Sequence, residues 1–123
     1  MTSVTTALPR SPDSVRTARQ LVLVETGSLG AQRSDDAALM VSELVSNALM
    51  HGTGAISLRI DIGSDELRIE VSDEGDAGIA PSPTRGADGG WGLRIVEELA
   101  DSWGVLEGST RVWFKLDQAR AAF

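Results

Sequence analysis

The sequence predicts a single α+β domain, built as a two-layer sandwich in which helices cover one face of a mixed, mostly antiparallel sheet. Two observations predict this class. Runs of alternating apolar and polar residues are joined by short turns, as in a sheet with one wet face, and two helix-like stretches precede them. The length of 123 residues suits one domain, so we expect a single unit over 1–123 without internal repeats.

The first elements are a short strand and a helix. Residues 1–8 contain a β-favouring run (3–8), which we expect to form an N-terminal strand. Ser11 as N-cap and Pro12 in the first turn form a helix-start signal, and the helix should end near Glu25. Its inward side is expected to carry Val15, Ala18, Leu21, Val22 and Leu29.

A second, longer helix is expected from Ser34 to Gly52. Two aspartates follow Ser34, and negative charge suits a helix N-terminus, whereas glycine is a common stop signal. The helix is apolar on most sides, so it should be largely buried. The apolar positions are Ala37, Ala38, Leu39, Met40, Val41, Leu44, Val45, Ala48 and Leu49.

Two alternating runs, 55–62 and 66–73, predict a hairpin joined by the turn GSDE. Residues 74–90 then carry five glycines and two prolines in 17 positions. An irregular insert of that length in a compact domain is usually functional or disordered. The remaining expected elements are a helix at about 91–101, strands at about 103–107 and 111–116, and a frayed tail at 118–123.

Composition excludes several kinds of site and partner. The chain has no cysteine, which rules out disulfides, thiolate zinc sites and cysteine nucleophiles, and its single histidine argues against a histidine-rich metal site. The net charge is −7 without any basic run, so we expect no direct contact with nucleic acid. No apolar stretch approaches ~18 residues, and we expect a cytoplasmic protein without membrane contact.

The expected long helix carries a polar stripe. Glu43, Asn47 and His51 are spaced i, i+4 and i+8, which places them on one face. This stripe is either the solvent side of the helix or one wall of a cavity. In a cavity, the Asn47 amide could ligate Mg²⁺, which takes few protein ligands, and Glu43 could accept the proton of an attacking hydroxyl.

Two glycine-containing motifs follow. Asp73 ends a strand before Gly75 and Gly78, which is either an ordinary turn or a place where a carboxylate meets an adenine amino group. Gly90 and Gly92 open a helix, where backbone N–H groups can cradle phosphate. The motif fits neither a Rossmann fingerprint, since no strand precedes it, nor a Walker P-loop, since no Gly-Lys-Ser/Thr follows.

Taken in order, the three motifs resemble those of a known family. ELVSNALMHG, DEGDAG and GGWGLRIVEELAD are similar to the N box and the two glycine boxes of the GHKL (histidine kinase-like) ATPases, over about residues 8–117. The N box ending in His51, GWGLRIVEELADSWGV and the terminal VWFKL resemble the small bacterial anti-sigma-factor serine/threonine kinases and their stand-alone actinobacterial relatives. The resemblance implies a Bergerat-type ATP-binding fold with a flexible ATP lid at 74–90.

The resemblance also implies cofactors, ATP and Mg²⁺, and residue roles. Asn47 would hold Mg²⁺ on the ATP phosphates, and Glu43 would be the general base. Asp73 would read the adenine amino group, with Gly75 beside it and Ile79 against the ring. The further implied ATP contacts are Gly78, the backbone N–H groups of Gly90, Gly92 and Leu93, and His51, which lies either near the phosphates or merely at the helix end.

Two departures from the family pattern are visible. The first glycine box reads D-x-G-x-x-G, one residue longer than the usual D-x-G-x-G, so the start of the lid is undefined. Arg111 holds the register where relatives place a threonine or serine near the adenine, and we expect Thr110 to take that role. Arg85 is either a phosphate contact from a closed lid, which ATP would order and ADP release, or an ordinary loop arginine.

The resulting functional hypothesis is an ATP-dependent serine/threonine protein kinase. It would phosphorylate a STAS-type anti-sigma-factor antagonist and sequester a sigma factor, and the resemblance implies a homodimer formed through the N-terminal strand and first helix. Two alternatives remain open. A catalytically silent, nucleotide-dependent binding module would not need Glu43, and the catalytic domain of a split histidine kinase would need its phosphoacceptor domain on another chain.

Overall fold

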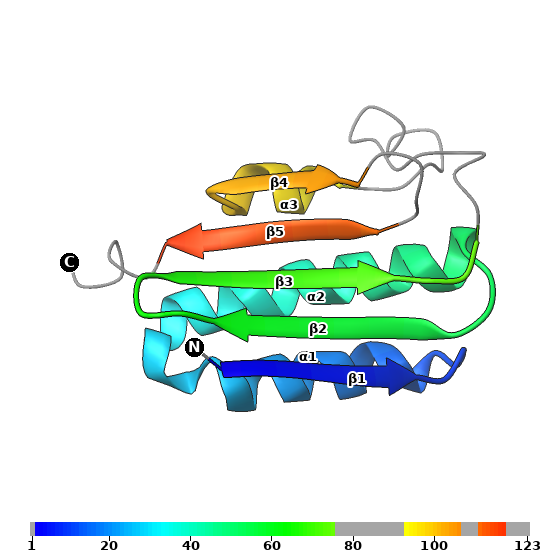
Figure 1. Cartoon of the computed structure of the whole chain (residues 1–123), viewed down its shortest axis with the longest axis horizontal. Helices are drawn as coiled ribbons and strands as arrows, with labels where there is room; N and C mark the ends of the chain where they lie inside the picture. The colour runs from blue at the N-terminus through cyan, green and yellow to red at the C-terminus, as the bar shows by residue number, and fades with distance from the viewer. Residues whose placement is uncertain (1, 76–92, 107–110, 118–123) are drawn as a thin grey trace.

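The computed structural model describes residues 2–75, 93–106 and 111–117. In this part of the chain, five strands form one sheet in the order β1-β2-β3-β5-β4, and the helices cover one of its faces (Figure 1). The four pairings between neighbouring strands are all antiparallel, so the described sheet lacks the parallel pair that a mixed sheet would contain. The predicted two-layer α+β class is confirmed.

The elements follow the predicted order, with one added 3₁₀ turn, η1. Their bounds are β1 (Thr2–Leu8), α1 (Asp13–Glu25), η1 (Gly27–Leu29), α2 (Ala31–His51), β2 (Ile56–Ile62), β3 (Glu66–Ser72), α3 (Arg94–Leu99), β4 (Ser102–Val105) and β5 (Val112–Asp117).

Both long helices start elsewhere than the sequence suggests. The cap residue of α1 is Pro12, while the Ser11 hydroxyl still accepts the Asp13 N–H at 3.3 Å. α2 begins at Ala31, ahead of the expected Ser34, because Gly30 at φ 96° turns the chain sharply out of η1. Ser34 therefore lies inside the first turn of α2, where it is buried rather than capping the helix.

The core fills the space between the helices and the inner face of the sheet. Alternation along the strands turns one side chain in two toward the helices, as predicted. α2 is buried along most of its length, but its solvent side exposes Leu39 and Met50. No helix in the described part of the chain has the length and apolarity needed to cross a bilayer. The strand side chains less than 2% exposed are Ile56, Leu58, Ile60, Leu67, Ile69, Phe114 and Leu116.

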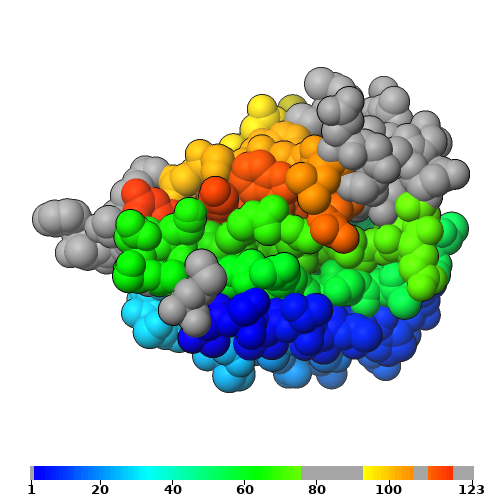
Figure 2. Space-filling view, in the orientation of Figure 1, coloured from blue at the N-terminus to red at the C-terminus, as the bar shows by residue number. Residues whose placement is uncertain are grey.

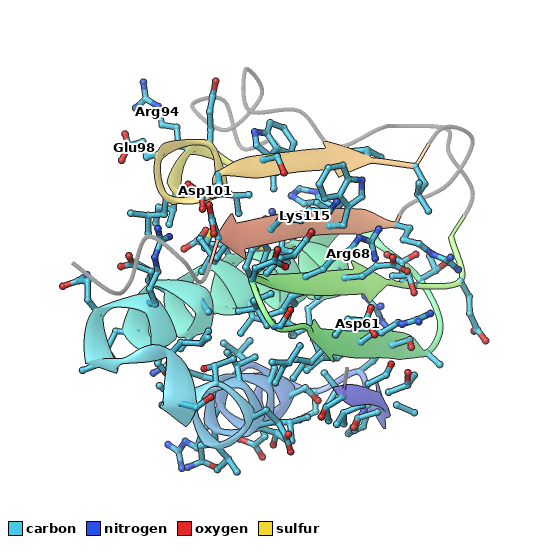
Figure 3. The ribbon with its side chains drawn as sticks, turned by 60° about the vertical axis from the view of Figure 1, so that its left-hand side comes forward. Asp61, Arg68, Arg94, Glu98, Asp101 and Lys115 are labelled. Carbon is cyan, nitrogen blue, oxygen red and sulfur yellow. The ribbon has the colours of Figure 1, made fainter. Side chains whose placement is uncertain are left out.

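The opposite face of the sheet is turned toward the viewer in Figure 2, and it carries paired charges, among them those of Arg68 and Lys115, which are labelled in Figure 3. Glu70 forms ion pairs with Arg68 (Nη1–Oε2, 2.7 Å) and Arg111 (Nε–Oε1, 3.0 Å). Lys115 Nζ lies 3.6 Å from Glu66 Oε2. The same Arg68 guanidinium lies 5.4 Å from the centroid of the Trp113 ring. These charged pairs lie on the face of the described sheet that the helices leave uncovered.

Candidate nucleotide site

The ends of three secondary-structure elements meet at one end of the sheet, on the right in Figure 1. α2 ends at His51, β2 starts at Ile56 and β3 ends at Ser72. Two of the three motifs that the sequence singles out lie here: the last turns of α2 carry Asn47, and Asp73 directly follows β3. The fold therefore brings the N box and the start of the first glycine box together.

Asn47 is buried, with 7% of its surface exposed, and its side-chain nitrogen has no hydrogen-bond partner in the described structure. Leaving a buried donor unsatisfied costs about 1–3 kcal/mol, so native proteins seldom keep one without a reason. A carboxamide fits a phosphate–magnesium site, because its nitrogen can donate to phosphate oxygen and its oxygen can ligate Mg²⁺. The residues present thus fit the nucleotide and metal that the motifs imply.

Glu43 lies one turn before Asn47 and is half-buried. It lines a groove of about 450 Å³ between α1 and α2, together with Arg19 and Ser42. Arg19 Nε donates to the Ser42 hydroxyl at 3.1 Å, and within the described structure Glu43 has no hydrogen bond or ion pair. Its carboxylate is therefore accessible and available as a proton acceptor.

Asp73 is held by its neighbours. Its Oδ1 accepts the Gly75 N–H at 2.6 Å, and its carboxyl group lies directly against the α-carbon of Gly52, where a β-carbon would overlap it. An ionised carboxylate has about four acceptor sites, so it can accept several hydrogen bonds at once. The glycine that ends α2 is also the glycine that makes room for Asp73.

The loop 52–55 is tied to the residues after β3. The Glu74 N–H donates to Thr53 O at 2.9 Å, and the Ala55 N–H donates to Glu74 Oε2 at 3.0 Å. Gly54 has φ 71°, and a β-carbon there would overlap the Glu74 side chain. The sequence patterns did not indicate these roles of Glu74, Gly52 and Gly54, for which the two glycines shortly after the end of α2 are the available signal.

Three further candidates have definite places. His51 is the last residue of α2 and is exposed. Leu93 is completely buried in the core just before α3, so only its backbone is available for the phosphate role that the resemblance implies. The Arg111 guanidinium binds Glu70 on the open face of the sheet, away from the helices. The other predicted contacts, together with Arg85, lie outside the described residues: Gly78, Ile79, Gly90, Gly92 and Thr110.

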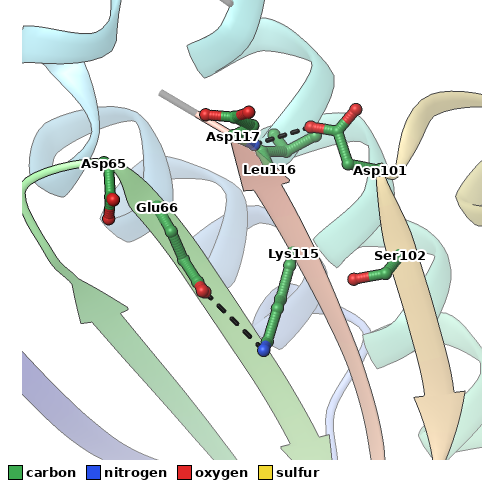
Figure 4. Close-up of a pocket in the computed structure, with 7 residues that line it drawn as sticks. All are labelled: Asp65, Glu66, Asp101, Ser102, Lys115, Leu116 and Asp117. Carbon is green, nitrogen blue, oxygen red and sulfur yellow. Dashed lines mark hydrogen bonds and ion pairs between the residues drawn. The ribbon is translucent and has the colours of Figure 1, made fainter. Parts of the chain in front are cut away.

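A separate hollow of about 290 Å³ lies at the opposite end of β3 (Figure 4). Its walls include the carboxylates of Asp65, Glu66, Asp101 and Asp117, against the single ammonium of Lys115. The Asp101 carboxylate already accepts the Asp117 N–H at 2.6 Å. A wall of carboxylates repels phosphate, so this hollow does not compete with the Asn47–Asp73 end as a nucleotide site.

Comparison with known proteins identifies the family. The family described as histidine kinase-like ATPase domain matches residues 8–116. The chain is also 32% identical over 113 residues to the serine-protein kinase RsbW of Bacillus licheniformis, covering 76% of this chain and 71% of that protein. The family match spans the N box, the end of β3 and nearly all of the last strand. The chain therefore belongs to the histidine kinase-like ATPase domain family.

Proposed function

We propose that this protein is an ATP-dependent serine/threonine protein kinase. The observation that carries the proposal is the buried, unpartnered Asn47 amide one turn from the accessible Glu43 carboxylate. A buried amide without a partner and, one helical turn away, a carboxylate free to take a proton would serve phosphoryl transfer. The similarity to a serine-protein kinase supports the choice of a hydroxyl acceptor.

The binding roles follow from the local chemistry. Asp73 would accept a hydrogen bond from the adenine amino group, and the missing β-carbon of Gly52 leaves the room that the Asp73 carboxyl group occupies. Asn47 would donate to phosphate oxygen and ligate Mg²⁺ through its amide oxygen. ATP with Mg²⁺ would supply a charge-neutralised phosphoryl group.

Glu43 would act on the acceptor. As the serine or threonine oxygen forms its bond to the γ-phosphorus, the bond to the ADP oxygen breaks and the hydroxyl proton passes to Glu43. The position of Glu43 in the α1–α2 groove leaves it reachable by a protein segment that carries the acceptor. General-base assistance of this kind contributes roughly 10²–10⁴-fold to rate.

The proposed protein substrate is a STAS-type anti-sigma-factor antagonist, and the proposed sequestered partner is a sigma factor. Both follow from the likeness to the anti-sigma kinases noted in the sequence motifs. The chain would act in the cytoplasm, and a homodimer formed through β1 and α1 belongs to the same proposal. β1 is an edge strand, since its outer side has no neighbouring strand in the described sheet. Such an edge is compatible with dimer formation.

The test is a transfer assay with γ-labelled ATP, Mg²⁺ and a purified STAS-type antagonist. Label should appear on a serine or threonine of the antagonist, and Glu43→Gln should remove the label while retaining ATP binding. Tight nucleotide binding without transfer to any antagonist would instead favour a silent binding module. Label on a histidine of a partner would favour a split histidine kinase.

A further inference from the structure

Arg10 lies in the short connection between β1 and α1, and its guanidinium faces the C-terminal end of α2. Nη2 donates to the carbonyl oxygens of Ala48 at 2.9 Å, Leu49 at 2.7 Å and Gly52 at 3.0 Å. Nη1 donates to the carbonyl oxygen of Gly54 at 3.2 Å. One side chain thus joins the last turn of α2 to the loop that follows it.

The base of this side chain is anchored. The Pro9 carbonyl accepts both the Ser11 N–H at 2.9 Å and the Ser14 hydroxyl at 2.6 Å, and Ser14 is buried at the start of α1. The ring of Pro9 additionally limits the backbone before Arg10. The backbone of Arg10 is therefore held at the start of α1, and its side-chain hydrogen bonds tie the end of α2 to that start.

The contacts suit arginine in particular. The last carbonyls of a helix lack partners within the helix and form the negative end of its dipole, which favours a cation. Nη2 carries only two hydrogens, so the carbonyls of Ala48, Leu49 and Gly52 share them in bifurcated bonds. Only a planar, branched donor can serve these oxygens and Gly54 together, whereas lysine would present a single point charge.

The loop 52–55 is held between two sets of contacts. On one side, Arg10 binds the carbonyls of Gly52 and Gly54. On the other side, the α-carbon of Gly52 rests against the Asp73 carboxylate, and Glu74 binds both Thr53 and Ala55. A shift of this loop would move the surface against which Asp73 is seated.

We propose that Arg10 is a positioning residue for the nucleotide site, acting through the loop 52–55 to hold Asp73 toward the adenine. This inference rests on the proposed function, because the expected effect of losing Arg10 is a change in nucleotide affinity. Asn47 is held by the helical hydrogen bonds of α2 and does not depend on the loop. Loss of Arg10 should therefore weaken the adenine contact while sparing the effect of Mg²⁺.

The test is calorimetric titration of the full chain with ATP and ADP, with and without Mg²⁺, for Arg10→Ala and Arg10→Lys. Arg10→Ala should raise the Kd of both nucleotides by the same factor, roughly tenfold, as expected for one misplaced hydrogen bond to a charged group. The ratio of ATP affinities with and without Mg²⁺ should change less than twofold. Arg10→Lys should remain several-fold weaker than the unaltered protein, and the matched control Arg16→Gln, exposed on α1, should bind normally.

A double-mutant cycle with Asp73→Asn separates positioning from general stability. If Arg10 acts through Asp73, then Arg10→Ala should change the Kd less than twofold in the Asp73→Asn background. An unchanged Kd in Arg10→Ala, with or without a reduced number of binding-competent molecules, would overturn the inference. So would a full tenfold loss in the Asp73→Asn background. Absence of binding by the unaltered protein would instead overturn the proposed function, and this inference with it.

Discussion

Gly52→Ala is the substitution for which the structure allows the clearest prediction. Gly52 has φ −95° and ψ −174°, a region open to alanine, so its own dihedral angles do not oppose the change. An added β-carbon would lie 2.5 Å from Asp73 Cγ and 2.7 Å from the Ala48 carbonyl oxygen. Carbon atoms in contact prefer a separation of about 3.5–4.0 Å, so the carboxyl group must retreat by about 1 Å.

That retreat would weaken nucleotide binding. The 2.6 Å bond between Asp73 Oδ1 and the Gly75 N–H would stretch beyond the usual hydrogen-bond range, and the carboxylate would leave the position proposed for adenine recognition. A hydrogen bond to a charged group contributes about 1.5–3 kcal/mol, which corresponds to a roughly ten- to hundredfold rise in Kd. The Asp73 side chain can rotate away, but the Ala48 carbonyl belongs to the backbone of α2, so the end of the helix must shift too and we expect Tm to fall as well.

The assay is calorimetric titration with ATP and ADP, paired with thermal denaturation. Gly63→Ala is the matched control, because its β-carbon would make only an ordinary contact, 3.5 Å from Glu66 O, in the β2–β3 turn. Gly63→Ala should bind both nucleotides like the unaltered protein. A folded Gly52→Ala protein with unchanged nucleotide affinity would refute the assignment of Asp73.

Three further predictions address Asn47, Glu43 and Asp61. Asn47→Leu should leave the unfolding free energy unchanged or raise it by up to about 1–3 kcal/mol, because it removes a buried unpaired donor. The same substitution should abolish the Mg²⁺-dependent part of ATP binding. A large loss of stability in urea denaturation would show instead that the Asn47 amide stabilises the fold. Glu43→Gln should retain the ATP Kd and lower the transfer rate roughly 10²–10⁴-fold, and single-turnover kinetics at the unaltered rate would contradict that role. Burial raises the pKa of Asp61, but the hydrogen bond from Ser3 and the Arg59 guanidinium outweigh it and hold that pKa below the ordinary 3.8. Asp61 therefore contributes stability above pH 3.8 that is lost as pH falls through the folded-state pKa, so Asp61→Asn should be less stable than the unaltered protein at pH 7 and equally stable in strong acid. A stability gap that persists in strong acid, measured by urea denaturation, would rule this out.

The elements of the fold were predictable because their signals are local. Alternation at 55–62 and 66–73 reports directly which side chains face the core, and Gly52 marks the end of α2. The start of α2 was not predictable in the same way. The two aspartates after Ser34 are a valid start signal, but Gly30 turns the chain earlier and the Thr26 and Ser34 hydroxyls bond to each other at 2.8 Å.

The site was predictable only in part, for a related reason. Asn47 and Asp73 stand out because their motifs have a fixed order and spacing along the chain. Arg10 bonds to carbonyls 38 to 44 residues away, and the contact between Gly52 and Asp73 depends on how α2 packs against β3. Contacts of this kind follow from the path of the chain, which no local pattern encodes.

The most direct test of the central claim is a calorimetric titration of the purified protein with ATP and ADP, each with and without Mg²⁺. We expect ATP binding that strengthens with Mg²⁺, an Asn47→Leu variant that loses this strengthening, and an Asp73→Asn variant that loses most affinity for both nucleotides. Absence of detectable binding of either nucleotide at millimolar concentration, by protein shown to be folded, would contradict the account.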